Sequence, residues 1–183
     1  GGVFFDWDPK YFYKEIFDDP KDLIFFLSNV CNESWNKKQD CGRSIEDAEN
    51  ELIPLFPNYE EQIKMYYPNH RKMIKGTFDL SIKVLENLKK LNYDCFVLSN
   101  WSAETFTGMT DEYPFLHKFD GLLISGEDKL KKPDFAIYEL AIKRFNLVPK
   151  ETVFIDDKLE NINAAKKIDL NIIHLIDPKS IES

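Results

Sequence analysis

The sequence predicts an α/β protein with a doubly wound, mostly parallel sheet and a small all-helical block inserted near the amino terminus. Two observations predict this class. After about residue 92, short apolar runs rich in Val, Ile, Leu and Phe alternate with helical periodicity, which is typical of buried parallel strands joined by helices. Between residues 9 and 75 we find helical periodicity and no convincing strand. The expected strands are DCFVLSN (94–100), GLLISGE (121–127), ETVFIDD (151–157) and NIIHLI (171–176).

The helices beside these strands are expected from apolar residues at helical spacing. SIKVLENLKKL (81–91) precedes the first strand, and with Leu80 before it this segment places Leu80, Val84, Leu85, Leu88 and Leu91 along one face. DFAIYELAIKRF (134–145) and KLENINAAKKI (158–168) connect the later strands. A strand followed by a helix, repeated in this way, indicates a doubly wound sheet.

The chain divides into three expected parts: a hinge remnant at 1–8, a helical cap at 9–75 and an α/β core at 76–183. No Gly/Ser-rich linker separates cap from core, so we expect the cap to pack on the core. Ser44 with Asp47 resembles a helix-opening capping box. The helical segments of the cap are PKYFYKEIF (9–17), KDLIFFLSNV (21–30), SIEDAENELIPLF (44–56) and YEEQIKMYYPNHRKMI (59–74).

Composition excludes several classes of function. Acidic residues outnumber basic ones by 32 to 24, so the net charge of -8 offers no basic surface for a nucleic-acid partner. The longest apolar run near the start, LIFFL (23–27), is far shorter than a membrane span. Three cysteines without CxxC spacing suggest neither a disulfide framework nor a zinc site, which favours a cytoplasmic location. The oligomeric state is left open.

Candidate site residues follow the expected strands, because ligands of open α/β sheets bind beyond the carboxyl ends of the strands. A hydroxyl and backbone amides there can bind phosphate oxygens, a lysine can neutralise charge, and a carboxylate pair can hold Mg²⁺. Each feature alone has an ordinary explanation: a turn, a helix N-cap or a solvated charge. Together they indicate a phosphate and metal site made of Ser99, Asn100, Lys132, Asp156 and Asp157.

Three segments resemble motifs of the haloacid dehalogenase-like (HAD) superfamily, in particular its phosphatase-like members with a Rossmann-like core and a small helical cap. The second, third and fourth motifs are matched, in order, by LSNWSAETF (98–106), KKPDFAIYELAIKRF (131–145) and VFIDDKLENINAAKK (153–167). The cap segment WNKKQDCGRSIEDA (35–48) also looks like members of the subgroup that contains Ser-Asn-Trp. The resemblance covers nearly the whole chain.

The resemblance implies roles for these residues. Ser99 would bind the transferred phosphoryl group, with the backbone at Asn100 helping. Lys132 would stabilise the nucleophile and the phosphate. Asp157, assisted by Asp156, would ligate Mg²⁺, and a further polar residue of the metal shell would be Asn161, one helical turn past Asp157.

The stretch FFDWD invites naming Asp6 as nucleophile and Asp8 as general acid. The resemblance implies otherwise, because GGVFFDW matches the residues that follow the nucleophile in a D-L-G-G-V motif. On this register Asp6 and Trp7 belong to the hinge, the nucleophile lies two places before Gly1, and Gly1 stands where a general acid is common. Residues 1–183 would then lack the first strand and the nucleophile, so this chain would be inactive through amino-terminal truncation.

Three functions follow. The leading one is a Mg²⁺-dependent phosphatase acting on a small phosphorylated metabolite, with a sugar phosphate as the expected substrate. The alternative within the superfamily is a 2-haloacid dehalogenase, which needs no metal; the pair Asp156 and Asp157 favours the phosphatase, because two carboxylates without a cation repel each other. The alternative from another class is a non-catalytic binding or regulatory protein.

Three further large side chains, Trp7, Trp101 and His70, need no catalytic role. Trp7 and Trp101 either wall the substrate or pack between cap and core. His70 is expected at the surface.

Overall fold

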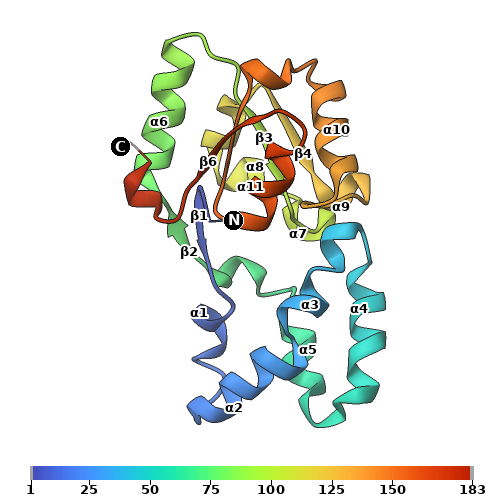
Figure 1. Ribbon diagram of the computed structural model, residues 1–183. Coiled ribbons are helices and arrows are strands. Elements are labelled where there is room, and N and C mark those ends of the chain that lie inside the picture. The colour runs from blue at the N-terminus through green and yellow to red at the C-terminus, as the bar shows by residue number, and fades with distance from the viewer. Residues whose placement is uncertain (1, 182–183) are drawn as a thin grey trace.

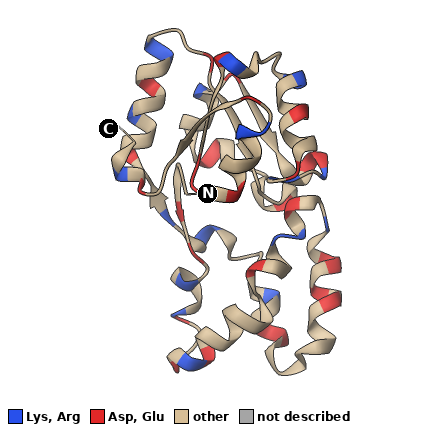
Figure 2. Ribbon diagram, viewed as in Figure 1, with Lys and Arg blue, Asp and Glu red and all other residues tan. Residues whose placement is uncertain are grey.

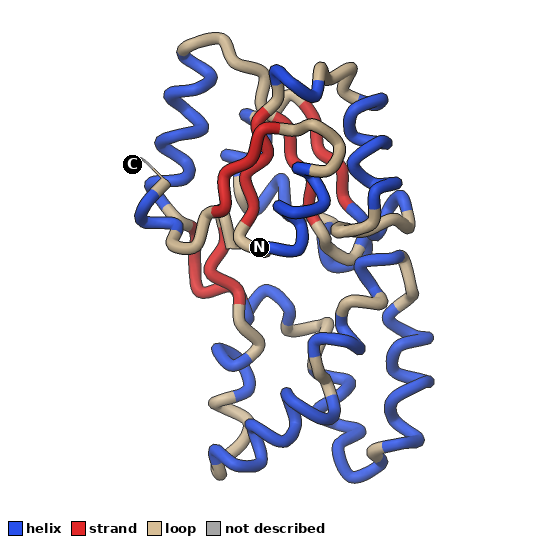
Figure 3. Tube along the Cα trace, viewed as in Figure 1, coloured by secondary structure: helices blue, strands red, loops and turns tan. Residues whose placement is uncertain are grey.

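The computed structural model describes residues 2–181, and within them a helical block and an α/β block lie end to end (Figure 1). All strands except the pair that joins the two blocks lie in the α/β block (Figure 3). The observed class is therefore the α/β fold with a helical cap that the sequence predicts. The helices of the cap are α1 (Lys10–Tyr13), α2 (Pro20–Phe25), a π-helical turn (Phe26–Val30), α3 (Glu33–Asn36), α4 (Ile45–Leu52) and α5 (Glu60–Met65).

Aromatic side chains build the interior of the cap. Tyr13 and Phe26 are fully buried with their ring centroids 4.8 Å apart, and the Tyr13 hydroxyl donates to the carbonyl of Gln62 at 2.7 Å. Burying such rings is strongly favourable, and the pair geometry adds about 0.5–1.5 kcal/mol beyond burial. Ser44 caps α4 by accepting a hydrogen bond from the backbone nitrogen of Asp47 at 3.0 Å, as its sequence predicts.

The hinge is a two-stranded antiparallel ribbon, which the sequence did not reveal. β1 (Phe5–Trp7) pairs with β2 (Ile74–Thr77), with Phe5 opposite Thr77 and Asp6 opposite Gly76. Both strands carry polar residues or glycine (Asp6 in β1, Lys75 and Gly76 in β2), so neither has the apolar run that marks the strands of the core. The ribbon joins the start of the cap to its end, so both chain crossings between cap and core lie together (Figure 1).

Two parallel strand pairs form the core. β3 (Phe96–Ser99) pairs with β4 (Gly121–Ile124), and β5 (Val153–Asp156) pairs with β6 (Asn171–His174). All four strands lie within the segments predicted for them. The helices of the core are α6 (Asp79–Lys90), α7 (Ala103–Phe106), α8 (Met109–Glu112), α9 (Ser125–Asp128), α10 (Phe135–Arg144) and α11 (Leu159–Lys166).

β3 and β5 face each other across a groove and share no ladder hydrogen bonds. Every residue of β3 is only half-buried, and the Val153 side chain in β5 is 53% exposed. Strands in the middle of a parallel sheet are ordinarily buried on both faces. The groove therefore leaves these two strands less buried than their sequences predict.

Candidate active site

A cavity of about 1030 Å³ occupies the groove between β3 and β5. The inner parts of its wall are apolar and come from both strands and from helices α6 and α10. At the carboxyl ends of the strands the wall is polar. The predicted site residues that line this end are Ser99, Lys132, Asp156 and Asp157.

Lys132 is the centre of the polar cluster. Its Nζ donates to Asp156 Oδ2 at 2.7 Å and to the carbonyl oxygen of Leu98 at 2.8 Å. The two charged side chains are 9% and 5% exposed. Burial alone raises the pKa of Asp156, but the Lys132 ammonium and further hydrogen bonds outweigh it and hold that pKa below its ordinary value. The structure thus contains a buried ion pair between Lys132 and Asp156.

The other oxygen of Asp156 is also engaged. Oδ1 accepts from the backbone nitrogen of Lys158 at 2.8 Å and from Asn161 Nδ2 at 2.9 Å. Asn161 therefore lies against Asp156 and fixes its orientation. Asp156 thus connects Lys132 to the start of α11.

Asn100 holds Lys132 from the opposite side. Its Oδ1 accepts from the backbone nitrogen of Lys132 at 2.8 Å, and its Nδ2 donates to the Lys132 carbonyl at 2.9 Å. This pair of bonds ties the end of β3 to the loop before α10. The sequence pointed to the backbone of Asn100; the role of its side chain was missed, because a contact between residues 32 positions apart leaves no local pattern.

Unlike Asp156, Asp157 makes no side-chain hydrogen bond within residues 2–181. It faces the backbone of Gly2, where an added Cβ would lie 2.6 Å from Asp157 Cγ. Within those residues no group of three or more His, Cys, Asp and Glu side chains could hold a metal ion. Magnesium is commonly held by one or two carboxylates together with waters and substrate phosphate, and a free Asp157 beside Ser99 fits that mode.

The aspartates of FFDWD lie outside the cluster. Asp6 Oδ1 accepts a 2.7 Å hydrogen bond from the Tyr11 hydroxyl, and Asp8 Oδ1 accepts from the backbone nitrogen of Lys10 at 2.8 Å. Neither lines the cavity between β3 and β5. The contact of Asp6 lies in the hinge, and that of Asp8 lies at the start of α1.

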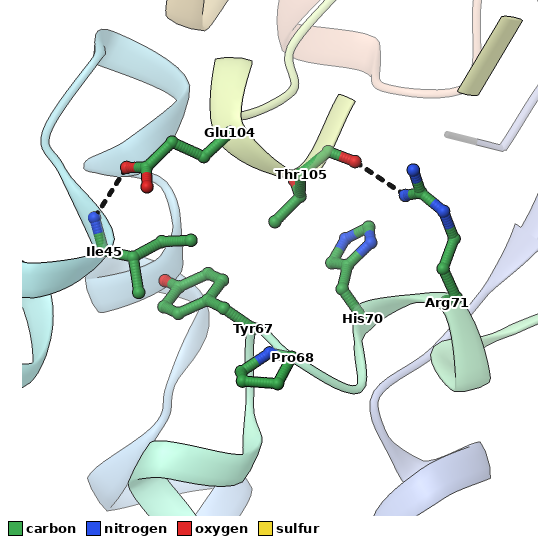
Figure 4. A pocket seen from close by; sticks show the side chains of 7 residues that line it. All are labelled: Ile45, Tyr67, Pro68, His70, Arg71, Glu104 and Thr105. Atoms are coloured by element: carbon green, nitrogen blue, oxygen red, sulfur yellow. Dashed lines mark hydrogen bonds between the residues drawn. The ribbon is translucent and has the colours of Figure 1, made fainter. Parts of the chain in front are cut away.

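A second cavity, of about 330 Å³, lies where cap and core meet (Figure 4). Two contacts bridge it: the Ile45 backbone nitrogen donates to Glu104 at 2.8 Å, and Arg71 donates to the Thr105 carbonyl at 2.6 Å. His70 in its wall is 8% exposed, so the expectation of a surface position is wrong.

His70 is buried because two tryptophans enclose it. Its ring lies 5.8 Å from that of Trp7 and 5.5 Å from that of Trp101. Trp101 is itself buried and bonded through Nε1 to Thr105, so both tryptophans pack between cap and core. Among residues 2–181, the Nδ1 of His70 and the Nε1 of Trp7 are buried without a hydrogen-bond partner.

A parallel α/β core under a helical cap, with a Lys–Asp cluster at the strand ends, defines a class of hydrolytic enzymes. The chain belongs to the haloacid dehalogenase-like hydrolase family, whose model matches residues 23–175. This match confirms the family that the motifs suggested.

The relatives include a phosphatase and a dehalogenase, the two enzyme activities considered above. The chain is 25% identical to a sesquiterpene phosphatase, AstK, of Aspergillus oryzae, over 97% of this chain and 87% of that protein. It is 27% identical to an (S)-2-haloacid dehalogenase of Burkholderia cepacia, but over only 51% of this chain and 40% of that protein.

Solved structures share the fold. A HAD family enzyme of Bacteroides thetaiotaomicron, solved as a magnesium complex, superposes with a TM-score of 0.73 at 19% identity, covering 94% of this chain and 88% of that one. The L-2-haloacid dehalogenase of Xanthobacter autotrophicus gives 0.61 at 13% identity, covering 91% and 71%. In the range 2–181, no helix has the length and apolar character needed to cross a membrane.

Proposed function

We propose that this protein is a Mg²⁺-dependent phosphatase that cleaves a small phosphorylated metabolite through an aspartyl-phosphate. One observation carries the proposal: four side chains from three strand ends and loops line one cavity at the carboxyl ends of β3 and β5. Their chemistry matches that needed to bind a phosphoryl group. The greater coverage of the phosphatase relative supports this choice over dehalogenation.

The proposed roles follow from the contacts. Ser99, at the end of β3, binds a phosphoryl oxygen through its hydroxyl and through the backbone that follows it. Lys132, held in place by Asn100 and Asp156, neutralises charge that grows on the phosphoryl oxygens. A preorganised cation of this kind stabilises the transition state without reorganising during the reaction.

Asp157 would hold Mg²⁺ together with the phosphate. When bound, the ion supplies charge neutralisation and orientation of the phosphoryl oxygens. Asp156 would assist, because its hydrogen bonds with Lys132, Lys158 and Asn161 hold its carboxylate in a fixed orientation beside Asp157.

The nucleophile is proposed to be an aspartate at the carboxyl end of a strand that fills the groove between β3 and β5. The groove supports this, because it is flanked by parallel strands on both sides and by apolar side chains of α6 and α10. An aspartate at the end of such a strand would lie beside Ser99, Lys132 and Asp157. None of residues 2–181 occupies that position.

The expected substrate is a sugar phosphate, and the expected location is the cytoplasm, where the three free cysteines stay reduced. The phosphate ester of an apolar alcohol is the second substrate class, because a relative is named a sesquiterpene phosphatase. We propose no nucleic-acid or membrane partner, since the net charge is -8.

The test is phosphate release by the chain extended with the sequence encoded upstream of Gly1. Sugar phosphates and terpenyl phosphates are supplied with Mg²⁺ or with EDTA, and 2-chloropropionate is supplied in parallel. We expect phosphate release that EDTA abolishes. Chloride release independent of metal would show a dehalogenase, and an upstream sequence without an apolar strand ending in Asp would favour a non-catalytic protein.

A further inference from the structure

A segment of the cap, Glu33–Gly42, lies across the catalytic end of the core; we call it the cap strap. Near its start, Lys37 Nζ lies 3.7 Å from Glu160 of α11, and Glu33 lies 3.7 Å from Lys158 Nζ. At its end, a Cβ on Gly42 would lie 2.8 Å from Lys129 and 3.0 Å from the carbonyl of Gly126. The strap therefore spans from the helix after Asp157 to the loop that leads to Lys132.

Asp40 lies in the strap, in a short 3₁₀ turn (Gln39–Cys41) that packs on α9. Among residues 2–181, the positive groups that act on its carboxyl are Lys131 and Lys132 of the core and Lys37 of the strap itself. From the cap interior, Tyr66 and Tyr67 are the titratable groups that sense its charge. Within residues 2–181, Asp40 makes no hydrogen bond or ion pair, so its carboxyl is not committed to another group.

A proton donor is needed on this side of the site. The alkoxide that leaves a phosphate ester is a strong base, and protonating it in the transition state commonly accelerates cleavage by about 10²–10⁴. Lys132 is bound by Asp156 and Leu98, and Asp157 is proposed for the metal. Asp40 is the uncommitted carboxyl that the cap brings toward Lys132.

We propose that Asp40 is the general acid and base of the phosphatase, supplied by the cap; this inference rests on the proposed function. In the first step, the nucleophilic aspartate forms an O–P bond, the ester O–P bond breaks, and the leaving oxygen takes the proton of Asp40. In the second step, water attacks phosphorus, the aspartyl O–P bond breaks, and Asp40 takes the proton from that water. The carboxyl thus returns to its starting state.

The environment of Asp40 agrees with this role. Burial raises the pKa of its carboxyl to about 6, although Lys131 and Lys132 oppose the rise. An acid with such a pKa is partly protonated near neutral pH and can also accept a proton there.

The experiment compares Asp40→Asn, Asp40→Glu and the matched control Asp18→Asn in the upstream-extended protein. Asp18 is an exposed cap aspartate, so its substitution makes the same change of charge away from the core. Each protein is assayed with an alkyl phosphate and with p-nitrophenyl phosphate, whose leaving group is a weak base. For Asp40→Asn we expect kcat/KM to fall by about 10²–10³ with the alkyl phosphate and by less than about fivefold with p-nitrophenyl phosphate. Asp40→Glu should recover part of the alkyl phosphatase activity, and Asp18→Asn should change neither.

A second measurement does not depend on activity or on a folded variant. The carboxyl carbon of Asp40 is followed by NMR in the unsubstituted protein, where we expect a titration midpoint at about 6. A midpoint near the ordinary value of about 4, or equal losses with both substrates, would overturn the role of Asp40 while leaving the phosphatase standing. Release of phosphate from neither substrate by the unsubstituted protein would instead overturn the proposed function itself.

Discussion

The cap and the core both have buried apolar interiors, but the core also contains an open groove between β3 and β5. Tyr13, Phe26, Ile63 and Met73 in the cap are at most 1% exposed. In the core, β3 is half-buried along its whole length and Val153 of β5 is more than half exposed. Charged residues of both signs are distributed along the elements of both regions (Figure 2).

The two regions differ in how their secondary structure buries apolar side chains. The helices of the cap bury their apolar faces against one another, so the cap closes with its own residues. A parallel sheet needs each inner strand to have a partner on both sides, because its unpaired backbone groups and side chains are otherwise left open. The groove between β3 and β5 is the place where such a partner is missing among residues 2–181.

Filling the groove is expected to have the largest effect. The upstream-extended chain should be more stable than the 183 residues by about 5 kcal/mol or more, since burying each apolar side chain contributes about 1.5–3 kcal/mol before the entropy of ordering is subtracted. For a protein of this size the thermal midpoint should rise by more than about 10 °C. Calorimetry measures both quantities.

The matched control for this prediction is an extension of equal length made of Gly and Ser, which cannot fill an apolar groove. It should leave the thermal midpoint within about 2 °C of that of the 183 residues. Equal stabilisation by both extensions would show that the groove is not a strand site.

Breaking the Lys–Asp pair tests the polar end of the same groove. Lys132→Met should cost about 3–5 kcal/mol of unfolding free energy, because it leaves the buried Asp156 carboxylate uncompensated. Chemical denaturation measures the loss. Phosphate release should be lost as well, since Lys132 neutralises the phosphoryl charge.

Two comparisons make this result specific. Lys64→Met removes an exposed i,i+4 pair with Glu60 in the cap and should cost no more than about 0.5 kcal/mol. Adding Asp156→Asn to Lys132→Met should restore stability without restoring activity. A loss equal to that of Lys64→Met would mean that the pair is not buried in solution.

Alanine substitutions in the two regions compare their packing directly. Phe26→Ala in the cap should cost about 3–5 kcal/mol, because the side chain is fully buried. Val153→Ala in the groove should cost less than about 1 kcal/mol in the 183 residues. In the upstream-extended chain, however, the cost of Val153→Ala should rise to about 2 kcal/mol, because a neighbouring strand would bury this side chain. If Val153→Ala costs the same unfolding free energy in both chains, the added strand does not lie beside Val153.

The sequence predicted the features that depend on local pattern. Apolar runs located β3 to β6, and helical periodicity located α6, α10 and α11. Because carboxyl ends of parallel strands share one edge of a sheet, the sequence also predicted that Ser99, Lys132 and Asp157 line one site.

Features that depend on long-range contact could not be predicted. The side chain of Asn100 bonds a residue 32 positions away, and His70 is buried only because two distant tryptophans meet around it. The strands of the β1–β2 ribbon contain Asp6, Lys75 and Gly76 and therefore lack an apolar run. In each case the energy comes from partners that only the folded chain brings together.

His70 lies where the two regions meet, and its titration should report how well they stay joined. Burial, reinforced by Arg71, lowers the pKa of His70 to about 4, whereas the unfolded chain binds that proton at about pH 6.5. Between these values the unfolded state holds more protons, so the unfolding free energy should fall as the pH is lowered from 6.5 to 4, by about 3 kcal/mol at most. Below pH 4 this loss should level off.

Denaturation curves across this pH range measure the effect, with His70→Leu to remove it and His117→Gln as the control at an exposed histidine. The control should keep the full pH dependence. The same slope in His70→Leu would mean that solvent reaches His70, and therefore that cap and core separate around the hinge in solution. If the pH dependence of the unfolding free energy disappears only in His70→Leu, the junction between cap and core stays closed in solution. The groove between β3 and β5 is then the open part of the molecule.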